Sequence, residues 1–166
     1  MKIKKFFICL GLILIITVSG CSLTKGLTKE EKAANETKLL EAIENRMFIV
    51  EVDRAIPMSG DSRMLTSPYS LEINGEKVKS YLPYFGRAYS VPYGGGEGLI
   101  FDADITDYKS SVEKKGTTVV EFKTKSKEDQ PVYCVHISSS GAASIDVTSI
   151  NRQPISFHGK ASPKKE

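Results

Sequence analysis

The spacing of apolar residues divides this chain into one helix followed by strands. Four apolar residues of the helical part recur at intervals of three and four: Leu39, Leu40, Ile43 and Met47. This spacing places them on one side of a helix, with charged residues on the other side. Thr28 and Glu31 match a capping box, which marks the first turn of a helix. The pattern therefore predicts a helix that begins at Thr28 and ends between Asn45 and Met47.

From Phe48 onward apolar and polar residues alternate, which is typical of half-buried strands. The pair Asn74-Gly75 predicts a two-residue type I′ hairpin, because both residues tolerate a positive φ. That turn places Leu71 opposite Val78 on one face of the hairpin and an acidic residue opposite a basic one on the other. The expected strands cover residues 48–53, 69–73, a stretch from 78, 98–106, 108–113, 117–124, 131–138, 143–150 and 155–159.

Short strands at hairpin spacing behind a single helix predict an α+β fold that is mainly β. We expect the N-terminal helix to pack on a curved antiparallel meander sheet, either a small barrel-like structure or a sandwich. The length suits one domain with a single core. The expected organisation is a signal peptide at 1–20, a lipidated cysteine and tether at 21–27, a β-rich domain at 28–160 and a disordered tail at 161–166.

The first twenty residues predict a lipoprotein signal peptide. Three lysines, Lys2, Lys4 and Lys5, precede an apolar run over residues 6–18 that is too short to span a membrane. The sequence Val-Ser-Gly-Cys then ends at Cys21, and small residues before a cysteine match the cleavage and lipidation site of bacterial lipoproteins. We expect a lipid on Cys21 to hold the protein on a membrane. The tether reaches at most about 20 Å, so the domain should sit close to the bilayer.

Charge and cysteine content limit the function further. Removing residues 1–20 takes away three of the 23 basic residues, which leaves 20 basic against 20 acidic ones. A neutral domain without a basic cluster provides no electrostatic footprint for nucleic acid, so we predict no nucleic-acid partner. Cys134 is the one cysteine left as a thiol, so an intramolecular disulfide is excluded. Its strand context favours burial, and an intermolecular bond is the alternative.

The stretch from Tyr81 to Gly98 concentrates aromatic residues, glycines and prolines. One interpretation is an ordered loop whose tyrosines pack over the sheet edge. The other is a surface for a ligand or partner, since tyrosines provide large contact areas and Arg87 is suited to hold a carboxylate. The candidate surface residues are Tyr81, Tyr84, Phe85, Arg87, Tyr89 and Tyr93. The glycines precede a strand and match no phosphate-binding motif, so nucleotide binding is excluded.

Two other groups of residues are weaker candidates for chemistry. Asp102, Asp104 and Asp107 lack the glycine and glutamate of the known calcium loop, and a solvated sheet face explains them better. Cys134 and His136 share a strand face, but positions two apart on a strand are about 7 Å from each other, too far for a thiol to be activated without special rotamers. We therefore predict no catalytic residue, no metal and no cofactor.

Four segments resemble a known family: VDRAIPMS at 52–59, LTSPY at 65–69, LPYFGRAY at 82–89 and GEGLIF at 96–101. They are similar to the domain-of-unknown-function 4251 family, whose members look like lipoproteins and periplasmic proteins of Bacteroides-type bacteria. The resemblance covers about residues 35–160. Because the family has no assigned activity, it implies an envelope location and a single domain, but no catalytic residues.

The same resemblance also predicts which side of the membrane the domain faces. Surface-exposed lipoproteins of such bacteria usually carry acidic residues directly after the acylated cysteine, whereas Ser-Leu-Thr-Lys follows Cys21 here. We therefore expect an outer-membrane anchor with the domain facing the periplasm. The leading functional hypothesis is a non-catalytic binding or scaffold lipoprotein with an unknown envelope protein as partner. The alternatives are a periplasmic carrier of a small ligand, with a cavity inside the curved sheet, and an envelope enzyme.

Overall fold

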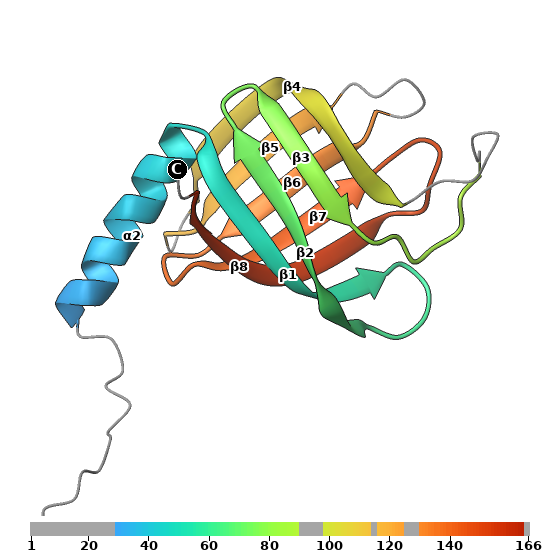
Figure 1. Cartoon of the computed structure of the whole chain (residues 1–166), viewed down its shortest axis with the longest axis horizontal. Helices are drawn as coiled ribbons and strands as arrows, with labels where there is room; N and C mark the ends of the chain where they lie inside the picture. The colour runs from blue at the N-terminus through green and yellow to red at the C-terminus, as the bar shows by residue number, and fades with distance from the viewer. Residues whose placement is uncertain (1–28, 90–97, 114–115, 125–129, 165–166) are drawn as a thin grey trace, which may run out of the picture.

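The computed structural model describes residues 29–89, 98–113, 116–124 and 130–164. One helix precedes eight strands (Figure 1). The elements are α2 (Lys29–Glu44), β1 (Met47–Pro57), β2 (Arg63–Asn74), β3 (Lys77–Leu82), β4 (Leu99–Val112), β5 (Thr118–Thr124), β6 (Val132–Ile137), β7 (Ala142–Thr148) and β8 (Ile155–Pro163). Among the described residues, no helix is long and apolar enough to cross a membrane.

The eight strands form a closed antiparallel barrel. Each strand pairs with the next along the chain, and β8 returns to pair with β1. Closure removes the exposed sheet edges through which β proteins aggregate. The predicted fold, mainly β with one N-terminal helix on an antiparallel meander, is confirmed, and of the two expected forms, barrel-like and sandwich, the structure has the barrel. Every pairing that closes the barrel lies within residues 47–163, so a chain that begins after Cys21 contains the whole fold.

Alternate residues of each strand face the barrel interior, as the period of two predicts. The rings of Phe122 and Tyr133 stack there with their centroids 5.0 Å apart and nearly parallel planes. The Tyr133 hydroxyl donates to Ser80 Oγ at 3.2 Å, and the Ser80 hydroxyl donates to the carbonyl oxygen of Leu99 at 2.6 Å. The buried hydroxyls of Tyr133 and Ser80 are therefore hydrogen-bonded, which avoids the cost of leaving them unpaired.

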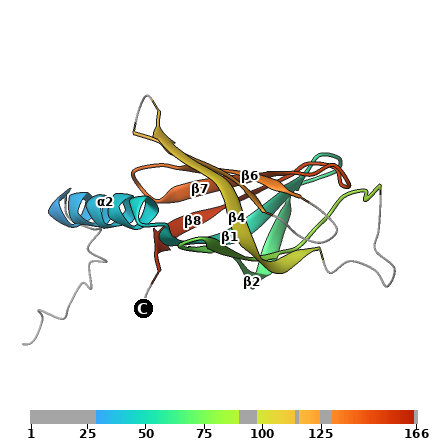
Figure 2. The same cartoon turned by 90° about the horizontal axis from the view of Figure 1, so that it is seen from above.

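Helix α2 contacts the barrel only through its last turns, and its outer part extends away from the barrel end (Figures 1 and 2). Leu39, Ala42 and Ile43 are buried, whereas Leu40 is 39% exposed. The predicted apolar side was therefore wrong at Leu40, and Met47 belongs to β1 instead of the helix. Residue 28, and with it the predicted capping box, lies outside the described residues.

The connection between α2 and β1 is held by a tyrosine from β4. The Tyr108 hydroxyl donates to the carbonyl oxygen of Ile43 at 3.1 Å, which satisfies one carbonyl of the last helical turn. The Arg46 guanidinium lies 4.3 Å from the centre of the Tyr108 ring. Arg46 itself has a φ of 55°, the left-handed conformation that commonly ends a helix. These contacts fix the end of α2 on the barrel wall.

The predicted register of the β2–β3 hairpin was wrong by one residue on each strand. Asn74 pairs with Lys77, so Gly75 and Glu76 form the turn, and Ile73 lies opposite Val78. Gly75 has a φ of 63° and Glu76 does not have a positive φ, which fits a type II′ turn with glycine at its first central position. The predicted register would have placed Glu76 opposite the buried Ile73, so the observed one avoids burying a carboxylate.

Two predicted boundaries also differ from the structure. The expected strands at 98–106 and 108–113 are one strand, β4, in which the pairing to β5 shifts near Asp107, whose φ is 55°. The tail expected at 161–166 was wrong for its first residues, because β8 continues to Pro163 and pairs there with Phe48. Ala161 is buried, so the barrel core retains this end of the chain.

The barrel has two ends of different character. Helix α2 and the β2–β3, β4–β5 and β6–β7 connections lie at one end, which we call the helix end. The β1–β2, β3–β4, β5–β6 and β7–β8 connections leave from the opposite end, the loop end (Figure 1). An up-and-down barrel with an even number of strands requires this separation, because consecutive connections alternate between its ends.

Gly159 makes the closing contact between β8 and β1 possible, so its replacement tests the closure. A Cβ atom there would overlap the carbonyl oxygen of Glu51 and lie 2.7 Å from Val52 Cα. Since both obstacles are backbone, β1 and β8 would have to separate. We expect Gly159→Ala to lower the free energy of unfolding by about 3 kcal/mol, measured by urea denaturation.

Ser162→Ala in the same strand provides the control, and its midpoint should stay close to that of the unchanged protein. A Gly159→Ala protein with an unaltered midpoint would contradict the assigned closure.

Candidate functional site

Residues 83–89, the described part of the aromatic segment after β3, lie at the loop end, and the described tyrosines of the segment have different roles. Tyr84 holds the segment together, since its hydroxyl lies 3.0 Å from the carbonyl oxygens of both Arg87 and Gln153. The Arg152 guanidinium lies 5.2 Å from the centre of the same ring and donates to the Gly98 carbonyl oxygen at 2.8 Å. Tyr84 therefore supports the packing interpretation of the segment.

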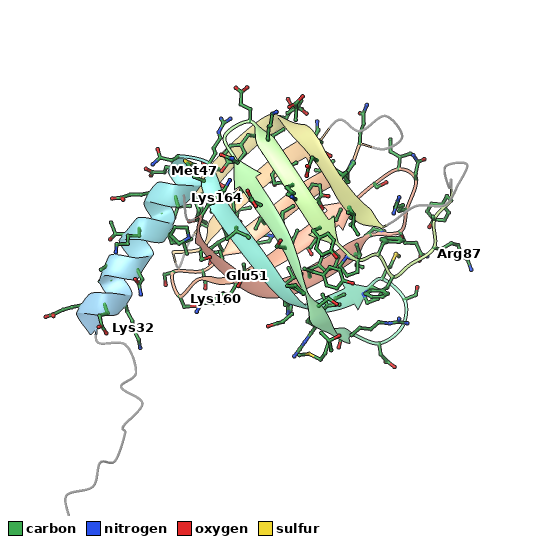
Figure 3. The ribbon with its side chains drawn as sticks, in the orientation of Figure 1. Lys32, Met47, Glu51, Arg87, Lys160 and Lys164 are labelled. Atoms are coloured by element: carbon green, nitrogen blue, oxygen red, sulfur yellow. The ribbon has the colours of Figure 1, made fainter. Side chains whose placement is uncertain are left out.

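Backbone hydrogen bonds attach this segment to the β7–β8 connection. The Tyr89 amide donates to the Asn151 carbonyl oxygen at 2.7 Å, and the Gln153 amide donates to the Arg87 carbonyl oxygen at 3.0 Å. The Arg87 amide donates to Gln153 Oε1 at 3.1 Å. These bonds use the backbone of the segment, so the side chains of Arg87 and Tyr89 project from a fixed support. Tyr89 is 65% exposed, and Figure 3 shows Arg87 at the loop end.

A groove at the loop end brings two arginines together. It has a volume of about 390 Å³. Its lining residues are Pro57, Ser59, Arg63, Phe85, Gly86, Arg87 and Gln153. We call it the arginine groove. Arg63 comes from the start of β2 and stacks on Phe85, with its guanidinium 4.8 Å from the ring centre. None of the described residues that line the groove carries a carboxylate, so its two guanidinium groups are suited to a carboxylate or phosphate, which they can bind in a bidentate manner.

The structure divides the six residues of the predicted surface. Phe85 and Arg87 line the arginine groove, Tyr89 is exposed at the same end, and Tyr84 is a structural support. Tyr81 lies in β3 and stacks on Tyr69 with centroids 5.3 Å apart, and it is not among the groove residues. Tyr93 lies outside the described residues, as does the predicted lipidation residue Cys21.

Arg63 and Gln153 were not predicted as site residues from the sequence. Arg63 follows the β1–β2 connection and Gln153 precedes β8, so both are far from the aromatic segment along the chain. Neither has a local motif that would single it out. Only the closure of the barrel places the β1–β2, β3–β4 and β7–β8 connections beside one another at the loop end.

Cys134 and His136 are closer together than strand spacing suggested. The Cys134 Sγ lies 3.3 Å from His136 Nε2, so the expectation that they are too far apart was wrong. The expectation that Cys134 is buried was also wrong: it is half-buried on the outer face of β6, while Tyr133 and Val135 face the interior. Asp146 Oδ2 lies 3.7 Å from the same Nε2 atom. In a catalytic triad the nucleophile and the carboxylate contact different nitrogens of the histidine ring. Here Cys134 and Asp146 both approach Nε2, so the three residues do not form a triad.

The environment of Cys134 also opposes activation of its thiol. Desolvation raises the pKa of Cys134, and the negative charges of Glu121, Asp146 and Glu113 raise it further. The thiolate is the nucleophilic form of cysteine, so a raised pKa keeps the group in its unreactive form near neutral pH.

The three aspartates near β4 do not converge. Asp102 and Asp104 are exposed on its outer face. Asp107 accepts a hydrogen bond from Lys123 Nζ at 2.9 Å, and this contact lowers the pKa of the Asp107 carboxyl. Within the described ranges, no three histidine, cysteine, aspartate or glutamate side chains are grouped in a way that could hold a metal ion.

The reactivity of Cys134 provides a test of its environment. Because its pKa is raised, we expect alkylation by iodoacetamide at pH 7 to be several-fold slower in the folded protein than in urea, and to accelerate as the pH rises to 9. Intact mass against time measures the rate, and His136→Ala should leave it unslowed. A rate that is equally high at pH 6 and pH 9 would show an activated thiol.

Comparison with known proteins places the chain in a family. A search of curated proteins finds no match. A crystal structure of a DUF4251 family protein from Bacteroides eggerthii DSM 20697 is similar in fold, with a TM-score of 0.61 and 17% identity over 79% of this chain and 89% of that chain. The model of the family described as "Domain of unknown function (DUF4251)" matches residues 30–161, from the first turn of α2 to β8. The chain therefore belongs to the DUF4251 family, as the four sequence segments predicted.

Proposed function

We propose that this protein is an envelope lipoprotein that binds a partner at the loop end of its barrel and catalyses no reaction. The observation that carries the proposal is the arginine groove, which combines two arginines with an aromatic ring and has no carboxylate among its described lining residues. The groove is suited to a carboxylate-bearing partner, because guanidinium groups pair with carboxylates in a fixed geometry. The exposed Met58 and Tyr89 at the same end add apolar contact area for a protein partner.

The lipid anchor and the groove would lie at opposite ends of the molecule. Helix α2 begins eight residues after Cys21, and it is attached to the helix end of the barrel. A lipid on Cys21 would therefore hold the helix end near the membrane and direct the arginine groove away from it. The proposed location remains the outer membrane with the domain in the periplasm. This arrangement suits a protein that presents a binding site to the surrounding compartment.

A periplasmic small-ligand carrier is the alternative, and the groove volume supports it, because about 390 Å³ falls in the range of small-molecule sites. The ligand would then bind in the arginine groove. Large side chains that are fully buried occupy the described part of the barrel interior: Phe48, Phe122, Tyr133 and Phe157. Both versions of the proposal use the same arginines, so one experiment tests them together.

The anchor is tested by labelling cells with a radioactive or alkyne-tagged fatty acid. We expect the unchanged protein to carry the label and to begin at Cys21, and Cys21→Ser to remain unlabelled because it lacks the sulfur that receives the lipid. Intact mass of the detergent-extracted protein gives the processed end. An unchanged protein without acyl chains would refute the anchor.

The arginine groove is tested by native mass spectrometry of residues 22–166 incubated with an envelope extract. We expect an added mass, of protein size for a scaffold or below about 1 kDa for a carrier. Arg63→Gln combined with Arg87→Gln should reduce the bound fraction at least about tenfold, since each lost charged hydrogen bond costs on the order of 1.5 kcal/mol or more.

Lys77→Gln combined with Lys79→Gln is the matched control, because it removes two exposed charges from the outer wall of β3. Equal binding by both double variants would show that the groove is not the site, and an unbound monomer throughout would contradict a binding function.

A further inference from the structure

A second groove lies at the helix end, between α2 and β8. Its volume is about 580 Å³. Lys32 and Lys38 line it from α2, and Lys160 lines it from β8. We call it the lysine groove. Figure 3 labels Lys32 on the outer part of α2 and Lys160 on the barrel at the same end. The groove is distinct from the arginine groove, which lies at the loop end.

The floor of the lysine groove is part of the folded core. Leu39 and Ala161 line it and are both buried. The Ala161 amide donates to the carbonyl oxygen of Gly141 at 2.7 Å, which holds the β6–β7 turn against β8. A Cβ atom at Gly141 would lie 3.8 Å from Leu39 Cδ2 and 3.9 Å from Lys160 Cε, so the helix and the Lys160 stem meet over this glycine. The groove therefore has a fixed shape.

The lysines of the groove are not neutralised. Among the described residues that line it, Glu36 is the one acidic residue. In the part of the chain that the structure describes, none of the three lysines forms an ion pair, and Glu51, which is opposite Lys160 in the β1–β8 ladder, forms none with it. Other lysines do have partners: Lys164 lies 2.7 Å from Glu72, and Lys123 lies 2.9 Å from Asp107.

Hydroxyl groups complete the chemistry of the groove. Ser139, Ser140 and Ser162 line it beside the lysines. Hydroxyl and ammonium groups both donate hydrogen bonds to phosphate oxygens, and a lysine contributes a point charge to such a contact. A groove with both lysines and serines is therefore suited to an anion that has several oxygen acceptors.

The position of the lysine groove indicates which molecule carries the anion that binds there. Seven residues lie between Cys21 and Lys29, so the two are at most about 28 Å apart when the chain is extended. We propose that the lysine groove binds the phosphates of anionic lipid headgroups in the membrane that anchors the protein. The inference rests on the proposed lipid at Cys21, and it adds a second contact that sets the orientation of the barrel. Basic residues near an anionic surface add electrostatic attraction to the hold of the lipid anchor, and their position fixes which side of the barrel faces the bilayer.

Vesicle sedimentation of residues 22–166 tests the groove without the lipid anchor. We expect binding to vesicles of phosphatidylcholine with 30% phosphatidylglycerol, and none to phosphatidylcholine alone. The binding should weaken as salt rises from 20 to 300 mM, because screening shortens the range of the attraction. Lys32→Gln, Lys38→Gln and Lys160→Gln together should weaken it at least about tenfold, since each lysine near an anionic surface is expected to contribute roughly fivefold.

Lys77→Gln, Lys79→Gln and Lys109→Gln form the matched control. They remove the same charge from β3 and β4, which lie across the barrel from β8, and should change binding by less than about twofold. Equal losses in the two triple variants would overturn the site, because they would indicate attraction to net charge alone. No binding to the anionic vesicles would overturn it as well.

Competition with inorganic phosphate distinguishes binding to membrane lipid from binding to a soluble phosphate ligand. At equal ionic strength, phosphate and chloride should compete equally weakly with the vesicles. Displacement by phosphate alone would overturn the assignment to lipid and indicate a soluble phosphate ligand. Absence of acyl chains on Cys21 would refute the anchor but leave the vesicle result unchanged, so the two failures are distinguishable.

Discussion

The pairing of β1 with β8 is the contact on which the rest of the structure depends, since without it the sheet would have two open edges. The two strands approach closely where Gly159 faces the backbone of Glu51 and Val52, and any side chain there would hold them apart. Directly after this point the pairing of β1 shifts between Val52 and Arg54 in both of its ladders. Such irregularities bend a strand, which helps a sheet to close on itself.

Closure also creates the functional geometry. The seven connections between consecutive strands alternate between the two ends of the barrel, so different segments of the chain gather at the helix end and at the loop end. Lysines gather between α2 and β8, and arginines gather around Phe85. A chain that is neutral without residues 1–20 thus places separated positive regions at opposite ends of its barrel. The proposed membrane contact and the proposed partner site follow from this separation.

Local patterns predicted the helix and the strands well, because a half-buried strand requires apolar and polar residues to alternate along the sequence. Alternation located the strands, and the described residues that follow α2 contain no further helix. The hairpin register was missed because Asn74-Gly75 and Gly75-Glu76 are both plausible turns. The choice between them was made by burial of Ile73 against Val78, which is a property of the packed barrel. Burial of Cys134 was predicted because its neighbours along the chain are apolar. The strand pairing instead turns Tyr133 and Val135 to the interior and leaves Cys134 on the outer face.

Short stretches of the chain encode the helix, the strand periodicity, the family and the aromatic segment that contributes Phe85 and Arg87 to a groove. Three features depend on the assembled barrel: the sheet closes, Arg63 joins Arg87, and α2 meets β8 over Gly141. The physical reason is distance along the chain. Strand and helix propensities depend on neighbours within a few residues, whereas both grooves are built from segments that meet only once β8 pairs with β1.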